Sequence, residues 1–225
     1  MKPVNTEFSR RTFLVGSSCA LVAGCSSSIS NPFVNRGGRE FAAEPFSSAY
    51  AALPNEQFPI PAVPRSALKP KFRRRRVRYQ TSEKPGTVVV DTRNFYLYHV
   101  EEDGRAMRYG VGLGRAGFEW SGRARVAWKR KWPTWTPPEE MIQRQPELRK
   151  WSAANGGMKP GLLNPLGSRA LYIFQGNVDT LYRLHGTPEH HSIGKAVSSG
   201  CVRLVNQDVI HLYDRVKSGS SIVVT

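Results

Sequence analysis

Cysteine is scarce in this chain of 225 residues, and the positions of its three cysteines restrict its chemistry. Cys19 and Cys25 lie near the N-terminus, which leaves Cys201 as the one cysteine of the remaining sequence. A single thiol cannot form an internal disulfide, so a fold stapled by disulfides is excluded there. The paired cysteine spacing of zinc fingers is also missing.

Acidic residues are few as well. The chain has 17 Asp and Glu against 33 Lys and Arg, a formal net charge of +16. Such an excess favours an anionic partner, which could be nucleic acid, a membrane surface or an acidic polymer. Because neither a zinc-finger spacing nor a basic heptad helix is present, we do not expect nucleic acid. The densest basic run, KPKFRRRRVR at 69–78, either contacts anionic lipid, lipopolysaccharide or wall polymer, or is simply a solvated segment.

Apolar runs are short. Residues 13–24 form an apolar stretch that is too short to span a bilayer comfortably. It follows Arg10 and Arg11 in the sequence SRRTFL, which resembles a twin-arginine export signal. Residues 22–25 (VAGC) resemble a lipobox, which implies cleavage before Cys25 and its lipidation. The alternatives are a plain anchor helix, or a signal peptide that is cut without lipidation.

The rest of the chain divides in two. Residues 26–74 are rich in Ser, Pro, Asn and Ala without a sustained period, so we expect a disordered linker. Residues 75–225 are expected to form one mostly β domain, and its many short strands with glycine turns predict an antiparallel sheet, sandwich or barrel. We expect Thr136 and Asn206 to cap two short helices, and residues 150–167 to form a lid loop. The predicted strands are 87–91, 95–100, 107–111, 123–132, 170–174, 181–185 and 221–225.

Cys201 and His185 are the candidate catalytic pair. Fifteen residues separate them, and a loop of that length can fold back to bring them together. A cysteine nucleophile needs a base, which a histidine can supply. The alternative is a buried structural cysteine. We expect no metal, because the neighbouring His190 and His191 point apart and the domain has no second cysteine.

The residues around this pair carry a family resemblance. The pattern HGT at 185–187, SIG at 192–194 and SSGCVR at 198–203 resembles the signature of the YkuD-type L,D-transpeptidases, cysteine enzymes that remodel peptidoglycan. The resemblance covers about 75–225 and implies a β-sandwich-like sheet with one or two short helices and a lid loop. Further similar segments are GVGLG at 110–114, WPTWTPP at 132–138 and NPLG at 164–167.

The residues suggest roles. Cys201 would attack an amide carbonyl, and His185 would take and return the proton. The resemblance implies that the backbone carbonyl of Gly186 holds the second nitrogen of His185. The turn before Cys201 offers backbone N–H groups, at Ser199 and Gly200, for an oxyanion.

Four further residues are candidates for binding substrate. Arg203 could pair with a substrate carboxylate, or form a structural ion pair. Ser198 could orient the turn, and both Tyr172 and Trp135 could line the groove or pack in the core. The chain departs from many relatives, which have histidine where this chain has Ser199 and asparagine at Arg203.

The resemblance implies a peptidoglycan L,D-transpeptidase that needs no cofactor. It would form an acyl-enzyme from a tetrapeptide stem, release D-alanine, and pass the acyl group to an amine of another stem or of an outer-membrane protein. Alternatives are an L,D-carboxypeptidase-type cysteine hydrolase and a non-catalytic, lipid-tethered wall-binding protein. We expect the chain to lie in the periplasm or cell envelope, anchored by lipid on Cys25.

Overall fold

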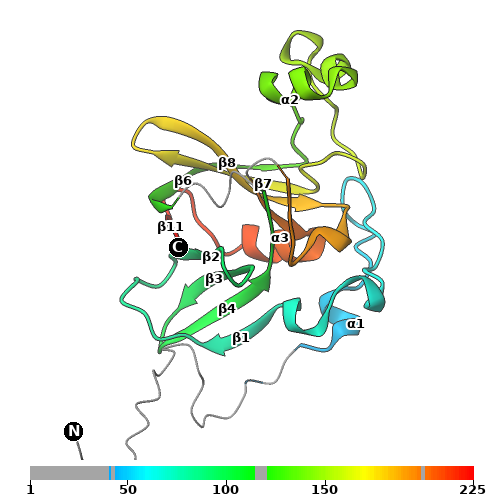
Figure 1. Ribbon diagram of the computed structural model, residues 1–225. Helices are drawn as coiled ribbons and strands as arrows, with labels where there is room; N and C mark the ends of the chain where they lie inside the picture. Colours follow the sequence, from blue (N-terminus) through cyan, green and yellow to red (C-terminus); the bar gives the residue numbers. More distant parts are fainter. Residues whose placement is uncertain (1–40, 42–43, 115–120, 199–200) are drawn as a thin grey trace, which may run out of the picture. The chain divides into compact units, whose positions relative to one another are not determined.

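The computed structural model describes residue 41 and residues 44–114, 121–198 and 201–225 (Figure 1). The predicted signal peptide, Cys25 and the first part of the predicted linker lie outside these residues. So do Ser199 and Gly200. No helix in the described part is both long and apolar enough to cross a membrane.

Among the described residues, eleven strands form one sheet, which confirms the predicted mostly β fold. Their order is β1-β4-β3-β2-β11-β6-β7-β8-β10-β5-β9. The strands are β1 (Arg75–Arg78), β2 (Val88–Asp91), β3 (Tyr96–Glu101), β4 (Arg105–Gly110), β5 (Gly112–Gly114), β6 (Gly122–Lys131), β7 (Arg169–Gln175), β8 (Val178–Thr187), β9 (Ala196–Ser198), β10 (Val202–Val205) and β11 (Ser221–Val224).

The sheet is mixed, although short strands with glycine turns predicted antiparallel pairing. Three neighbouring pairs are parallel: β11 with β2, β10 with β8, and β5 with β9. Parallel neighbours need a long crossover rather than a tight turn. Helix α3 (Asn206–Tyr213) lies in the connection from β10 to β11, two strands that are separated in the sheet by β6, β7 and β8.

The helices are short, and their caps differ from the prediction. Helix α2 (Glu139–Arg144) starts after Pro138 rather than Thr136. Helix α3 has Val205 at its cap position with no side-chain cap bond. The side chain of Asn206 instead accepts the backbone N–H of Ser168 at 2.9 Å, so its role is tertiary. The remaining helical segments are α1 (Phe46–Ala49) and 3-10 turns at Arg65–Ala67, Pro70–Phe72, Pro146–Trp151, Ala153–Asn155 and His190–Ser192.

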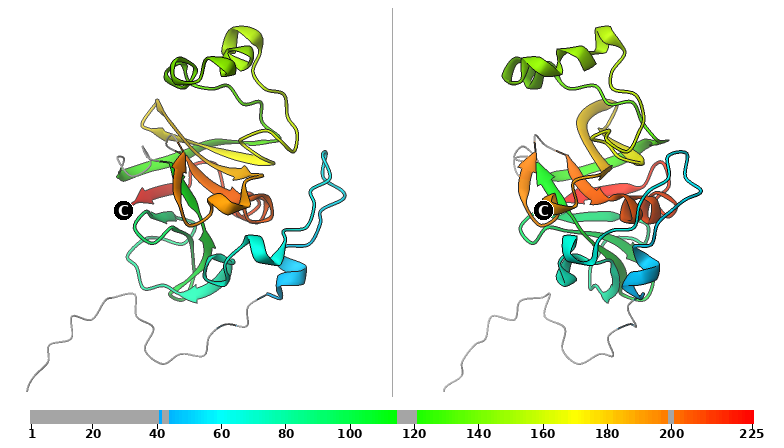
Figure 2. Two further views of the ribbon diagram at one scale, coloured as in Figure 1. Left: turned by 45° about the vertical axis from the view of Figure 1, so that its right-hand side comes forward. Right: turned by 90° about the vertical axis from the view of Figure 1, so that its right-hand side faces the viewer.

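One core contains side chains from strands β2 to β8, from β10 and β11, and from helix α3. On β8, Leu184 is fully buried in this core, whereas the residues beside it point to the other face of the strand. Helix α3 packs against strands β7, β8 and β10 of the sheet (Figures 1 and 2). The core includes Val88, Val90, Leu97, Tyr109, Leu171, Ile173, Leu184, Leu204, Val209, Leu212 and Ile222.

Residues 44–74 are not a disordered linker, so the predicted boundary at residue 74 is wrong for this part. The segment packs on the domain and forms a second apolar cluster with it. Its apolar residues are spaced irregularly, and a search for helical or strand periods therefore misses them. The cluster contains Ala49, Tyr50, Val63, Leu68, Phe72, Ile193 and Val205.

A buried polar network fastens this segment to α3. Arg74 is 9% exposed and pairs with Glu44 at 2.8 Å and with Asp208 at 3.3 Å. The Tyr50 hydroxyl donates to Asp208 at 3.2 Å and accepts the backbone N–H of Arg74 at 2.6 Å. Since a buried charge without its partner is costly, these bonds hold 44–74 in one position.

A second ion pair fastens the same segment to β7. Arg169 is almost fully buried, and its two terminal guanidinium nitrogens donate hydrogen bonds to Glu56, at 2.6 and 2.9 Å. The indole of Trp132, at the end of β6, also donates to Glu56 at 2.9 Å. These bonds hold the pKa of Glu56 below its ordinary value, with the Arg169 hydrogen bond as the main cause.

Candidate active site

The candidate residues meet on the face of β8 and β10 that is turned away from the core. The two strands are parallel, with Leu184 beside Val202 and His185 beside Arg203. Leu184 and Val202 are core residues. Side chains alternate along a strand, so His185 and Arg203 lie together on the opposite face. Cys201, just before β10, reaches the same face.

His185 is 3% exposed, and its ring is fixed by its own neighbour. Its Nδ1 lies 2.6 Å from the Gly186 carbonyl oxygen. A carbonyl can only accept, so Nδ1 carries the hydrogen and Nε2 is left as a bare acceptor. Burial lowers the pKa of His185 to about 4, and the Arg203 and Arg183 cations add to this. The imidazole is therefore neutral near pH 7, as a general base must be.

The Gly186 backbone sits in a space that admits no side chain. A Cβ added there would lie 2.3 Å from the Asn206 amide oxygen and 3.1 Å from the Ser168 nitrogen. Gly167 closes the same junction, with a φ of 61° that favours glycine. The backbone of Gly186, whose carbonyl orients His185, is thus enclosed by two separate parts of the chain, residues 167–168 and Asn206.

Cys201 is half-buried, and its sulfur accepts a hydrogen bond from the Arg183 backbone. Burial raises the pKa of the Cys201 thiol, although this bond and the Arg183 and Arg203 cations oppose the shift. Both pKa shifts favour the uncharged forms at rest, a thiol at Cys201 and a neutral imidazole at His185, rather than a preformed ion pair.

This resting state predicts how Cys201 reacts with alkylating agents. Only the thiolate attacks iodoacetamide, so the Cys201 rate constant should rise about tenfold per pH unit from pH 7 to 9. Peptide mapping of the full-length chain separates Cys201 from Cys19 and Cys25. Glutathione, whose thiol is exposed, serves as the reference. A Cys201 rate that is already constant at pH 7 would instead indicate a thiolate–imidazolium pair.

A column of stacked side chains leads from the surface to Cys201. Trp128 of β6 and Tyr172 of β7 are parallel with centroids 3.5 Å apart, and Trp128 is 37% exposed. Arg130 lies over Trp128 at 5.2 Å, and Arg183 lies over Tyr172 at 4.4 Å. Asp179 fixes Arg183 through two bonds of 2.7 and 2.8 Å. This flat, cationic platform could bind a peptide that carries carboxylates.

Of the residues in this column, only Tyr172 is predicted from the sequence. Arg183 could have been found, because it precedes His185 by two positions on one strand and must share its face. Trp128 and Arg130 depend on the pairing of β6 with β7, which includes a register shift next to Trp128. No sequence pattern shows that pairing.

Arg203 has a partner in the structure. Its guanidinium pairs with the carboxylate of Glu189 at 2.8 Å, and Glu189 is 54% exposed. The structural ion pair that the sequence left open for Arg203 is therefore formed at rest. The two side chains line a small cavity of about 60 Å³ beside Leu163 and Pro165. A carboxylate that entered this cavity would compete with Glu189 for Arg203.

The structure does not bring every predicted residue to Cys201. Trp135 belongs to the segment between β6 and β7, where its backbone pairs with Met158 and its ring lies 6.1 Å from that of Trp151. Ser198 ends β9, with its backbone paired to Gly114. The oxyanion donors at 199 and 200 lie outside the described residues and stay a prediction.

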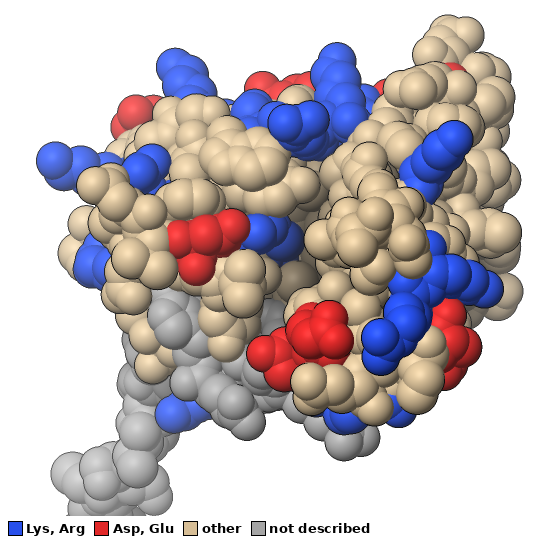
Figure 3. Space-filling model, turned by 90° about the horizontal axis from the view of Figure 1, so that it is seen from above, with Lys and Arg blue, Asp and Glu red and all other residues tan. Residues whose placement is uncertain are grey.

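Charge is mixed on the face of the molecule that is seen from above. Seen from above, basic side chains spread over the face with acidic ones between them (Figure 3). Within that view the basic groups do not merge into one continuous stripe.

The family model and two curated relatives that this chain matches are all described as L,D-transpeptidases. The model of the YkuD family, described as the L,D-transpeptidase catalytic domain, matches residues 85–224. The probable L,D-transpeptidase ErfK/SrfK of Escherichia coli K12 is 33% identical over 145 residues, 60% of this chain and 42% of the relative. YbiS of the same strain, also a probable L,D-transpeptidase, is 32% identical over 141 residues, 60% of this chain and 43% of the relative. The chain thus spans less than half the length of these relatives.

Solved structures were compared as well. A Brucella melitensis protein, described as a probable carnitine operon oxidoreductase, is 46% identical, with 71% of this chain and 97% of that chain covered and a TM-score of 0.49. An L,D-transpeptidase from Mycobacterium smegmatis is 21% identical, with 62% and 58% covered and a TM-score of 0.44.

Proposed function

Because the chain belongs to the YkuD family of L,D-transpeptidase catalytic domains, we propose that it transfers acyl groups between peptidoglycan stem peptides. Cys201 is the nucleophile and His185 the general base and acid. The observation that carries this proposal is the 2.6 Å bond from His185 Nδ1 to the Gly186 carbonyl, since it leaves Nε2 as the acceptor for the thiol proton.

His185 accepts and returns a proton in each of the two halves of the reaction. His185 Nε2 takes the Cys201 proton as the sulfur attacks the carbonyl carbon after the third stem residue, which forms a C–S bond. The C–N bond to D-alanine then breaks, and His185 returns its proton to the leaving amine. An acceptor amine then attacks the thioester and gives a proton to His185, the C–S bond breaks, and His185 returns this proton to the Cys201 sulfur. The cation formed on His185 is transient, which suits a site where burial disfavours charge.

Backbone and side chains supply the rest of the site. The N–H groups of Ser199, Gly200 and Cys201 stabilise the oxyanion, and Ser198 orients this turn. The stem lies along the Tyr172 platform, and Trp135 is the residue whose backbone pairs with the predicted lid loop, at Met158. Each of these roles is an assignment that mutation can test.

Arg203 binds a carboxylate of the stem after displacing Glu189, and this predicts opposite effects of two substitutions. Glu189→Gln should lower KM about two- to fivefold at unchanged kcat, because the competing charge is gone. Arg203→Gln should raise KM about 10- to 100-fold, through the loss of a charged hydrogen bond. Steady-state kinetics with tetrapeptide stems measures both. Glu102→Gln, in an exposed turn, is the control; a rise in KM for Glu189→Gln would show that Glu189 supports Arg203.

The envelope is the proposed location. The export sequence SRRTFL at 9–14 and the lipobox at 22–25 support export and lipidation of Cys25. Labelled palmitate should enter the full-length chain but not a Cys25→Ala variant. Labelling of both, or of neither, would remove the lipid anchor from the account.

The products separate the transferase from its alternatives. Incubation of the chain with a disaccharide-tetrapeptide should release D-alanine and give cross-linked dimers by mass spectrometry. An outer-membrane protein remains a second possible acceptor amine. Free tripeptide without dimers would instead identify an L,D-carboxypeptidase-type hydrolase, and no product at all would favour a wall-binding protein. A Cys201→Ala chain is the blank.

A further inference from the structure

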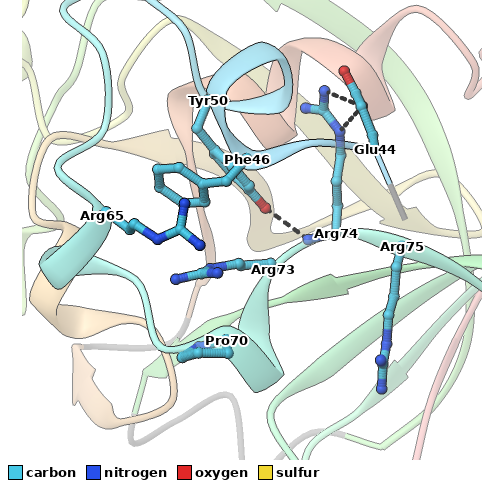
Figure 4. Close-up of a pocket in the computed structure, with 8 residues that line it drawn as sticks. All are labelled: Glu44, Phe46, Tyr50, Arg65, Pro70, Arg73, Arg74 and Arg75. Carbon is cyan, nitrogen blue, oxygen red and sulfur yellow. Dashed lines mark hydrogen bonds and ion pairs between the residues drawn. The ribbon is translucent and has the colours of Figure 1, made fainter. Parts of the chain in front are cut away.

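A second site lies outside the catalytic face, in the segment that precedes β1. A cavity of about 220 Å³ opens there, between α1 and the turns at 65–67 and 70–72 (Figure 4). Arginines make up half of its lining residues: Arg65, Arg73, Arg74 and Arg75. All lining residues come from 44–75, so no group of the catalytic site contributes.

Two of these arginines converge on one aromatic ring. The guanidinium carbons of Arg73 and Arg65 lie 4.5 and 5.5 Å from the centroid of Phe46. Figure 4 shows the two side chains approaching each other beside Phe46, with Pro70 below Arg73. Two like charges held this close repel, and the aromatic ring offsets only part of the cost.

No protein carboxylate neutralises this pair within the described residues. Arg73 donates to the Leu68 carbonyl at 3.4 Å, and its Nε is buried without a hydrogen-bond partner. The acid in the cavity wall, Glu44, is already taken by Arg74, to which it bonds at 2.8 and 3.2 Å. Among the described residues, the guanidinium groups of Arg65 and Arg73 therefore have no carboxylate partner, and an external anion would neutralise them.

We propose that this cavity binds a phosphate ester, and that the guanidinium groups of Arg65 and Arg73 donate hydrogen bonds to its phosphate. In this chain one guanidinium suffices for one carboxylate, as Arg169 shows with Glu56 and Arg183 with Asp179. Two converging guanidiniums match a tetrahedral oxyanion, which has more acceptor oxygens and more charge. The rings of Phe46 and Pro70 form an apolar wall for the carbon skeleton of the ester. The ester could be a lipid headgroup or a soluble compound.

Binding of glycerol phosphate to the full-length chain tests this site by calorimetry. Arg65→Gln with Arg73→Gln should weaken binding at least about 30-fold, because charged hydrogen bonds are lost. The control is Arg78→Gln with Arg93→Gln, two exposed arginines outside the cavity, which should change Kd by less than about threefold because solvent screens distant charges. Equal losses in both variants, or no binding by the unaltered chain, would overturn the proposal.

Two further arms complete the experiment. Arg65→Lys with Arg73→Lys keeps both positive charges but replaces each forked guanidinium with a single ammonium group. Affinity for glycerol phosphate should therefore fall by an intermediate factor of at least about threefold. This variant also tests the site if the glutamine variant fails to fold; unchanged binding would contradict the proposed geometry. Vesicles of phosphatidylglycerol in phosphatidylcholine identify the source. Competition between vesicles and glycerol phosphate indicates a headgroup, and glycerol phosphate binding without vesicle binding indicates a soluble ester. Transpeptidase activity should be unchanged in every variant, so failure here is distinguishable from failure of the catalytic proposal.

Discussion

Replacement of His185 by glutamine is expected to lower kcat/KM for tetrapeptide stems by about 10³-fold or more. Glutamine fills a similar volume and can still donate to the Gly186 carbonyl, but it cannot take a proton from Cys201. A thiol whose pKa is raised by burial gains little thiolate on its own near pH 7. The base is therefore essential to nucleophile formation, and not only to the release of D-alanine.

The control for this prediction is the double variant with Cys201→Ala. The two residues act as one unit, so the second substitution should add almost nothing to the loss. Thermal melting of the His185→Gln chain checks that the buried junction around Gly186 still forms. A kcat/KM within tenfold of the unaltered chain would show that another group takes the proton.

Phe72→Ala is expected to lower the free energy of unfolding by about 3–5 kcal/mol. Phe72 is 4% exposed and fills a niche made by two glycines. A Cβ at Gly110 would lie 2.4 Å from the Phe72 Cβ, and one at Gly194 would lie 2.0 Å from its ring. The ring thus joins the segment 44–74 to the end of β4 and to the loop that contains Gly194. Its loss would leave a cavity that the neighbouring residues cannot fill.

Urea unfolding followed by fluorescence measures this effect. Leu163→Ala is the matched control, because Leu163 is 81% exposed and its truncation should change stability by less than about 0.5 kcal/mol. An unchanged midpoint for Phe72→Ala would mean that residues 44–74 unfold independently of the sheet, as a linker would.

The strands could be predicted from the sequence because they are short runs of apolar, β-branched and aromatic residues bounded by turns. The predicted 95–100 and 170–174 correspond to β3 and β7, whose residues pack on both faces. The segment 44–74 could not be predicted in the same way. Its order depends on single contacts such as Arg74 with Asp208, which join residues 134 positions apart. Polar contacts over such a distance leave no local pattern.

Some features of the candidate site could be predicted from the sequence in the same way, and others could not. The signature residues Cys201, His185 and Gly186 are visible in the sequence, and the structure places His185 and Gly186 on β8 and Cys201 just before the neighbouring strand β10. The partner of Arg203 and the platform beside Tyr172 are not visible, because both depend on register between strands. Asn206 shows the converse error. Its position suited a helix cap, but a buried N–H of Ser168 competes for the same oxygen.

The most direct test of the account is the covalent state of Cys201 after exposure to a carbapenem, which acylates nucleophilic thiols by ring opening. Intact-mass spectrometry of the full-length chain, followed by peptide mapping, should show one drug mass added at Cys201. The adduct should be absent in Cys201→Ala and strongly reduced in His185→Gln. A folded chain that carries no adduct at Cys201 would contradict the assignment of this residue as the catalytic nucleophile.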